Sequence, residues 1–207
     1  SDSIKHECGV AMLRLLKPLE YYQKKYGTSL YGLNKMYLLM EKQHNRGQDG
    51  VGLANVKLDV APGKRYISRK RSVASNPIQD VFKQVNKRFV ELEESDPDKL
   101  KDPKWMKENL PFTGELFLGH LRYGTFGSNT IEQCHPFLRQ NNWKTRNLVL
   151  AGNFNMTNVD ELFEQFLDLG KHPKQMADTV TILEKIGHFL DEANDDIYYE
   201  NREKFSK

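Results

Sequence analysis

The sequence is poor in cysteine, in long apolar runs and in net charge, and each shortage excludes a class of protein. Two cysteines among 207 residues cannot form a disulfide framework, so reduced thiols in a cytoplasmic setting are expected. No apolar run has the length of a membrane span, and the polar N-terminus does not look like a signal peptide. The net charge of +3 is too small to require a nucleic acid or a membrane surface as partner.

Metal-ligand spacing is also missing. The six histidines form no His-x-x-x-His group, and the two cysteines form no Cys-x-x-Cys group. We therefore expect neither a metal nor an organic cofactor in this chain. An iron–sulfur cluster would need more cysteines than the sequence has.

What is present fits a globular chain with one substantial core, because 38% of the residues are hydrophobic and 29% are charged. The segment 95–107, with two prolines and seven charged residues, is expected to be a loop. Strands in clusters with helices between and after them suit a layered packing of sheets and helices. The hydrophobic pattern predicts strands at 8–16, 51–56, 64–71, 115–123 and 147–151, and helices at about 30–44, 78–92, 158–167 and 178–190.

The first candidate for chemistry is Cys8, which is followed by Gly9 and lies close to the start of the sequence. A cysteine thiol can be a nucleophile while the freed backbone amine of the same residue acts as the base. That amine exists only if residues 1–7 are removed. The structural alternative is that Cys8 is a small buried core residue.

Three further motifs follow predicted strand or helix ends, where site residues are commonly mounted. They contain Arg46 and Asp49, then Arg122, then Asn153 and Asn155. The structural alternatives are, in the same order, a helix stop, a surface ion pair and turn formation. Asp178, which lies outside the three motifs, could be a helix N-cap. Neighbours on an extended chain point to opposite faces, which argues against Cys134 and His135 as a thiol–imidazole pair.

Taken in this order, the motifs resemble those of the class II glutamine amidotransferases. They read Cys-Gly at 8–9, Arg-Gly-Gln-Asp-Gly at 46–50, Gly-His-Leu-Arg-Tyr-Gly-Thr at 119–125 and Gly-Asn-Phe-Asn-Met-Thr-Asn at 152–158. The resemblance runs from 8 to 190 and is weak over 57–112. Gln48 within the second motif is typical of members that serve a phosphoribosyltransferase domain in purine biosynthesis.

The resemblance implies an α+β fold of the Ntn-hydrolase type, with two stacked antiparallel sheets between helical layers. It implies L-glutamine as the substrate and Cys8 as the nucleophile that attacks its side-chain amide. Asn153 and the N–H of Phe154 would stabilise the oxyanion. The remaining implied contacts are to the substrate: Arg122 to the α-carboxylate, Asp178 with Asp49 and Gly50 to the α-ammonium, and Thr125 beside Arg122.

Two departures from the family pattern stand out. Phe154 replaces the glycine whose N–H usually completes the oxyanion hole, and its Cβ restricts the backbone there. The sequence also contains no phosphoribosyltransferase domain. We therefore expect a leader, 1–7, and a glutaminase domain, 8–207, cut from or evolved apart from a larger synthase. Homo-oligomerisation stays open.

Two other hypotheses are kept. One is a non-catalytic regulatory or scaffold domain that retains its leader and binds glutamine without turnover. The other treats the basic run 64–71 as a nucleic-acid patch, although one such run falls short of a clustered basic face. A solvated hairpin edge, where Lys and Arg discourage aggregation, is the simpler interpretation of that run.

Overall fold

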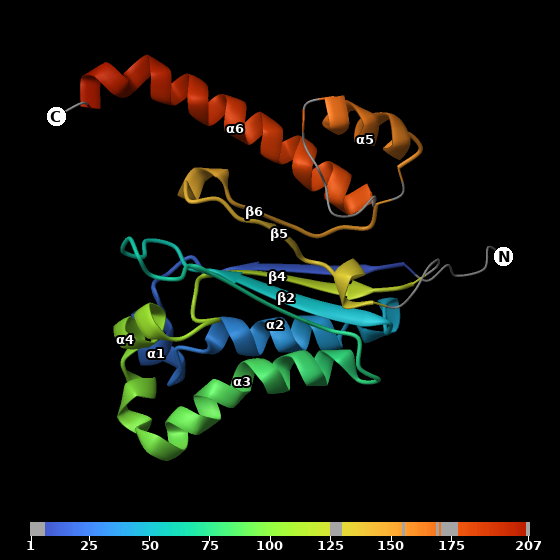
Figure 1. The fold of residues 1–207 in the computed structure, drawn as a ribbon. Coiled ribbons are helices and arrows are strands. Elements are labelled where there is room, and N and C mark those ends of the chain that lie inside the picture. The colour runs from blue at the N-terminus through green and yellow to red at the C-terminus, as the bar shows by residue number, and fades with distance from the viewer. Residues whose placement is uncertain (1–6, 125–129, 155, 169, 171–177, 206–207) are drawn as a thin grey trace. The chain divides into compact units, whose positions relative to one another are not determined.

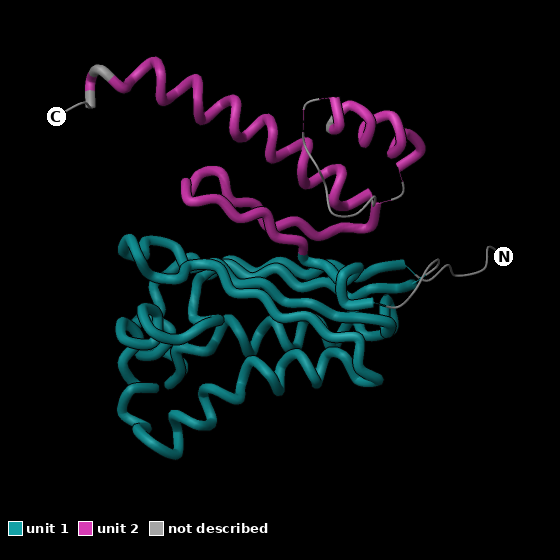
Figure 2. The backbone as a smooth tube through the Cα atoms, viewed as in Figure 1, with its two compact units in different colours: residues 1–136 teal, residues 137–207 magenta. Residues whose placement is uncertain are grey.

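The computed structural model describes residues 7–124, 130–154, 156–168, 170 and 178–205. The chain divides into two compact units, 1–136 and 137–207, and each is described by itself (Figure 2). The secondary structure is mixed α/β with two antiparallel sheets. Within the described ranges, none of the helices combines the length and apolar character that a membrane crossing requires.

The first unit is built on a four-stranded antiparallel sheet with the strand order β1-β4-β2-β3 (Figure 1). The strands are β1 (Gly9–Arg14), β2 (Gly50–Val56), β3 (Ile67–Ser72) and β4 (Leu116–Arg122). The strands predicted at 8–16, 51–56 and 115–123 are thus confirmed with slightly different ends. The long connection from β3 to β4 returns the chain to the middle of the sheet, between β1 and β2.

Helices cover one face of this sheet (Figure 1). They are α1 (Leu19–Tyr26), α2 (Tyr31–Glu41), α3 (Pro77–Ser95) and α4 (Pro103–Asn109). The apolar residues that recur at helical spacing in α2 and α3 form the buried faces of these helices. Met36, Met40 and Val81 are fully buried. They pack against Leu53 and Leu121 of the sheet in one hydrophobic core.

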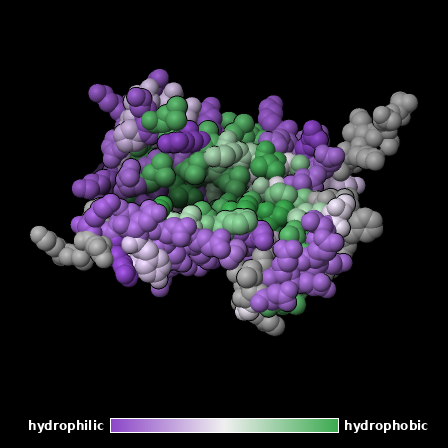
Figure 3. All heavy atoms as spheres, turned by 90° about the horizontal axis from the view of Figure 1, so that it is seen from above, coloured by the Kyte–Doolittle hydropathy of each residue, from purple (hydrophilic) through white to green (hydrophobic). Residues whose placement is uncertain are grey.

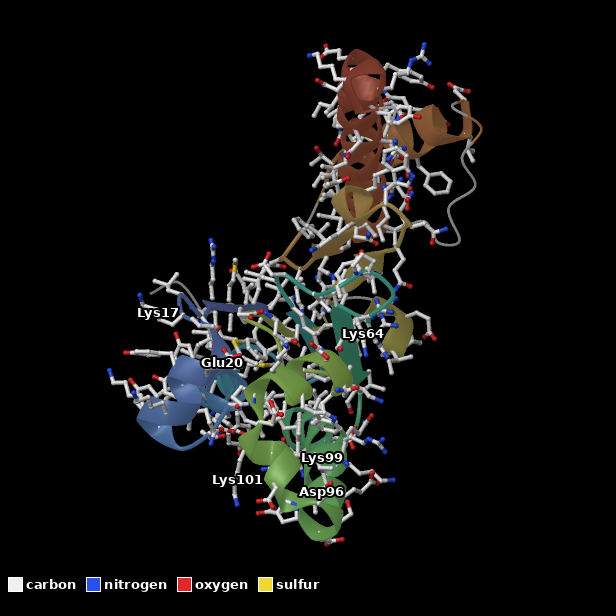
Figure 4. The ribbon with its side chains drawn as sticks, turned by 90° about the vertical axis from the view of Figure 1, so that its left-hand side faces the viewer. Lys17, Glu20, Lys64, Asp96, Lys99 and Lys101 are labelled. Carbon is white, nitrogen blue, oxygen red and sulfur yellow. The ribbon has the colours of Figure 1, made fainter. Side chains whose placement is uncertain are left out.

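The prediction of a loop at 95–107 was wrong. The segment holds a 3-10 helix, η2 (Pro97–Lys101), and helix α4. The Asp102 carboxylate caps α4 by accepting a hydrogen bond from the Trp105 N–H at 2.9 Å, and Met106 is buried. Lys99 pairs with Asp96 at 2.8 Å (Figure 4), and Lys107 pairs with the buried Glu115 at 2.5 Å.

The strand predicted at 64–71 exists as β3 at the edge of the sheet, but it is not uniformly solvent-facing. Ile67, Ser68 and Ser72 are buried, because β3 pairs with β2 and packs on α3. Arg69 and Arg71 donate hydrogen bonds to backbone carbonyls of the segment 132–136. These two arginines therefore hold the chain's own backbone.

The second unit contains β5 (Phe137–Arg139), η4 (Lys144–Arg146), β6 (Leu148–Leu150), α5 (Val159–Asp168) and α6 (Asp178–Phe205). The buried strand predicted at 147–151 is present as β6 but is only half-buried. Helix α5 starts directly after Asn158, as the capping pattern predicted. Arg139 of β5 binds Asp191 of α6 through both guanidinium nitrogens, and this pair ties the two-stranded sheet to the helix.

Hydrophilic residues dominate the surface seen in Figure 3, and apolar side chains show between them. In the first unit, Val10 and Met12 of β1 are 42% and 66% exposed. The alternate β1 residue, Ala11, is buried in the helix-covered core. Val10 and Met12 therefore lie on the opposite face of the sheet.

Candidate functional site

Three strand ends meet at one end of the four-stranded sheet: β1 begins, β2 begins and β4 ends there. The register pairs Gly9 with Leu121 and Gly50 with Arg122. Continuing the β1–β4 register by one residue places Cys8 opposite Arg122. Three of the motifs found in the sequence are thereby brought together although they lie about 40 and 70 residues apart along the chain.

Cys8 is half-buried and lies against the backbone of Tyr123. The Tyr123 N–H donates a hydrogen bond to the Cys8 Sγ at 3.5 Å, and the Tyr123 carbonyl lies 4.0 Å from the same sulfur. The sulfur therefore has both a backbone donor and a backbone acceptor next to it, and the thiol can donate to the carbonyl. Cys8 is thus neither a fully buried core residue nor a remote surface residue.

Asp49 fixes the turn that leads from η1 (His44–Arg46) into β2. Its N–H donates to the Arg122 carbonyl at 3.1 Å, and its carboxylate accepts the Gly124 N–H at 2.8 Å. The turn approaches β4 so closely that a Cβ on Gly47 would lie 2.5 Å from the Arg122 carbonyl carbon. In this arrangement Asp49 holds together the two loops that surround Cys8.

Arg122, the expected carboxylate ligand, ends β4 and is half-buried. Its Nη2 donates a hydrogen bond to Oε1 of Gln133 at 2.7 Å. Sequence reasoning missed Gln133. It belongs to no recognised motif and lies on η3 (Ile131–Gln133), a three-residue turn that only the fold brings to Arg122.

The segment after η3 holds a buried thiol and a buried imidazole. Cys134 is fully buried, and burial raises the pKa of its thiol, which keeps it neutral. His135 stacks on His120 with the ring centroids 4.3 Å apart. Burial first, and then the neighbouring His120, lowers the pKa of His135 to about 3. A neutral thiol and a neutral imidazole in the core agree with the structural interpretation of this pair.

A cavity of about 240 Å³ opens beside the second motif. It lies between Gly47 and Gln48 on one side and the start of α3, from Asn76 to Gln79, on the other. Cys8 and Arg122 do not line it. The cavity therefore adjoins the site without containing the thiol.

The remaining predicted residues lie in the second unit or outside the described residues. Asn153 is exposed and Phe154 is half-buried, in the segment that follows β6. Asp178 is the first residue of α6, and its carboxylate accepts the Met156 N–H at 2.9 Å. Thr125 and Asn155 fall outside the described residues.

The part of the chain that the structure describes contains no group of three or more His, Cys, Asp or Glu side chains able to hold a metal ion. The groups that the structure places at the sheet end are a thiol, a guanidinium, a carboxylate and backbone amides.

The comparisons with known proteins are consistent with the glutamine amidotransferase domain of amidophosphoribosyltransferases. Among curated proteins the chain is similar to amidophosphoribosyltransferases. The enzyme of Pasteurella multocida (strain Pm70) is 29% identical over 150 residues, 72% of this chain and 23% of the relative. That of Haemophilus influenzae is 26% identical over 157 residues, 75% of this chain and 25% of the relative.

A third relative, the amidophosphoribosyltransferase of Lacticaseibacillus casei, is 33% identical over 76 residues, 37% of this chain and 38% of the relative. The chain thus spans between 23% and 38% of the length of these relatives. A solved structure, the glutamine phosphoribosylpyrophosphate amidotransferase from B. subtilis complexed with ADP and GMP, matches 70% of this chain and 24% of its own, with 24% identity and a TM-score of 0.42. No family model matches the sequence.

Proposed function

We propose that this chain hydrolyses the side-chain amide of L-glutamine to glutamate and ammonia, with Cys8 as the nucleophile. The observation that carries the proposal is the placement of Cys8 opposite Arg122 at one sheet end, with the Tyr123 N–H donating to the sulfur. The similarity to amidophosphoribosyltransferases supports it independently.

The reaction requires a base for the thiol and an acid for the leaving group. The Cys8 thiol gives its proton to the α-amine of Cys8, and the sulfur attacks the amide carbon. When the tetrahedral intermediate collapses, the C–N bond breaks and the amine returns the proton to the departing ammonia. Water then hydrolyses the thioester and releases glutamate and the free thiol. The α-amine exists only after the Glu7–Cys8 peptide bond is cut, so removal of residues 1–7 belongs to the proposal.

The other groups bind substrate or stabilise charge. Arg122 receives the α-carboxylate, because a guanidinium fork can donate two parallel hydrogen bonds to it. Asn153 and the Phe154 N–H donate to the oxyanion, where loss of one donor costs about 2.7–4 kcal/mol of barrier. Asp178 and the backbone at Asp49 and Gly50 bind the α-ammonium, with Thr125 lining the pocket.

The proposed fold is the αββα sandwich of the Ntn-hydrolases. In the first unit the helices cover one face of the sheet, while Val10 and Met12 expose apolar side chains on the other. An exposed apolar sheet face is stabilised when a second sheet packs on it. Domain boundaries of 1–7 for the leader and 8–207 for the glutaminase domain accompany this fold.

In the complete protein, we propose that the ammonia passes to a phosphoribosyltransferase or other synthase domain in cytoplasmic purine biosynthesis. The names of the relatives support this assignment. The competing proposal is a non-catalytic glutamine-binding domain that keeps residues 1–7. An intact-mass measurement separates the two: a turnover-competent species begins at Cys8, whereas a leader-bearing species that binds glutamine without turnover supports the alternative.

The direct test replaces Cys8 and uses the second cysteine as a matched control. In the species that begins at residue 8, C8A should abolish ammonia release from glutamine and covalent labelling by a glutamine-like electrophile. C134A should retain both, because that thiol is buried and neutral. Undiminished labelling or glutaminase activity in C8A would show that Cys8 is not the nucleophile.

A further inference from the structure

Gln133 is the neutral side chain that touches the guanidinium of Arg122. Its amide Oε1 accepts a hydrogen bond from Arg122 Nη2 at 2.7 Å, and both side chains are half-buried. A hydrogen bond of this length to a charged donor is at the strong end of the range seen in proteins. The contact therefore selects one orientation of the guanidinium.

An arginine that binds a carboxylate benefits from such a partner. An arginine side chain loses conformational entropy when it becomes ordered on binding. A guanidinium that is already ordered loses less of that entropy when the ligand binds. A neutral acceptor adds no negative charge next to the guanidinium. A carboxylate in the same place would form an ion pair with Arg122 and compete with the ligand.

The turn that carries Gln133 is itself fixed to the sheet. Arg71 Nη1 donates to the Cys134 carbonyl at 2.9 Å, and Arg69 Nη1 donates to the Pro136 carbonyl at 3.2 Å. The Arg69 and Arg71 side chains leave β3 on the same face because they are two residues apart on a strand. This segment therefore holds a defined position over the sheet face on which Arg122 lies.

Two glycines of β2 make room for the segment. A Cβ on Gly52 would lie 1.9 Å from the His135 carbonyl oxygen, and a Cβ on Gly50 would lie 2.4 Å from the Cys134 sulfur. The register pairs Gly50 with Arg122, so the segment crosses β2 next to the arginine. The absence of side chains at these two positions sets the distance between Gln133 and Arg122.

We propose that Gln133 is a positioning residue that orients the Arg122 guanidinium to receive the α-carboxylate of glutamine. The proposal rests on the glutaminase function proposed above. It assigns the 131–136 segment a role in substrate affinity rather than in the chemical step, since Gln133 acts through Arg122.

The test is Q133L, which keeps the approximate volume of the side chain and removes its acceptor. The KM for glutamine should rise about tenfold, the equivalent of about 1.4 kcal/mol, while kcat changes less than about twofold. This pattern is expected because the substitution weakens the bound substrate and the transition state equally. Q133E should also raise KM, since its carboxylate competes with the substrate. The matched control is E132A, an exposed side chain on the same turn, which should change neither constant.

A second substrate separates positioning from a general structural effect. Glutamine whose α-carboxylate is converted to an amide offers no anion to Arg122, so Q133L should leave its kcat/KM unchanged. An equal loss on both substrates, a fall in kcat at constant KM, or no effect of Q133L on glutamine would each overturn the role of Gln133.

Failure of the glutaminase proposal is visible separately. If the species beginning at residue 8 releases no ammonia, or C8A releases as much as the parent, the proposed function is wrong whatever Q133L does. Glutamine binding to C8A, measured by calorimetry, then decides the positioning role: Q133L in that background should weaken the Kd about tenfold. An unchanged Kd, or no binding of glutamine to the C8A chain, would overturn it.

Discussion

At the scale of single residues, the site depends on how closely the backbone segments approach each other. Gly47 contacts the β4 backbone and Gly52 contacts the His135 carbonyl, both at distances that a side chain would not allow. The polar side chains mainly accept hydrogen bonds that fix neighbouring segments. The Asp49 carboxylate accepts the Gly124 N–H, and the Gln133 amide oxygen accepts a hydrogen bond from Arg122. Among the described residues, the Cys8 sulfur is hydrogen-bonded to the backbone of Tyr123.

The buried His135 predicts a dependence of stability on pH. Its pKa of about 3 in the folded chain lies below the ordinary value of 6.5, because burial disfavours the charged ring. Between these values the unfolded chain binds one more proton. The stability that His135 contributes is therefore full above pH 6.5 and falls toward pH 3, by at most about 1.4 kcal/mol per pH unit.

Urea unfolding at several pH values between 7 and 4 measures this effect. H135F keeps an aromatic ring beside His120 and removes the titrating group, so its free energy of unfolding should fall less steeply with decreasing pH. H44Q, at an exposed histidine, is the control and should follow the parent. Parallel curves for H135F and the parent would contradict the assignment.

At the scale of elements, the strands that meet at the sheet end were predicted from the sequence, whereas the short helix α4 was not. Strands β1 and β4 were predicted from the sequence as short, mostly apolar segments. In 95–107, prolines and charges indicate a loop, yet Pro97 and Pro103 occupy the first turns of helices. Proline is well suited to that position because its missing N–H would have had no partner in the helix anyway.

The packing of α4 can be tested with two substitutions two residues apart on the helix. M106A should destabilise the chain by about 2–5 kcal/mol, because Met106 is only 1% exposed and its removal leaves a cavity in the core. K104A, on the exposed side of the same helix, should change the free energy of unfolding by less than about 0.5 kcal/mol. Chemical denaturation compares them, and equal effects would show that α4 does not pack as described.

At the scale of the whole molecule, the proposed mechanism draws on residues from both units and on the removal of residues 1–7. Cys8, Asp49 and Arg122 lie in the first unit, whereas Asn153, Phe154 and Asp178 lie in the second. The proposed mechanism needs both groups and also a free α-amine on Cys8. The form of the chain that carries residues 1–7 has an amide nitrogen at that position, which cannot act as the base.

This difference predicts that maturation controls activity. Cutting between Glu7 and Cys8 should raise the glutaminase kcat by about 10²–10⁴-fold, the usual contribution of a general base. A specific protease site placed before Cys8 allows ammonia release to be measured before and after cleavage of one sample. The matured chain with its α-amine acetylated should behave like the uncut chain, and full activity in either blocked form would refute the role of the amine.

The sequence predicted the local features of the fold and the chemical identity of most proposed site residues. Helices α2 and α3 follow from apolar residues at helical spacing, since the period of a helix is a property of neighbouring residues. Cys8 and Arg122 were found through ordered motifs and their resemblance to a family. Gln133 could not be found in this way, because nothing in Glu-Gln-Cys-His distinguishes it from an ordinary polar turn.

The sequence by itself therefore determined most of the strands, the buried faces of α2 and α3 and the candidate nucleophile, but not helix α4. The tertiary structure alone decided that β4 lies between β1 and β2, that Cys8 is opposite Arg122, and that η3 carries Gln133 to that arginine. The physical reason is distance along the chain. Periodicity and capping act between residues a few positions apart, whereas strand order and close backbone approach join residues that only the packed sheet brings together.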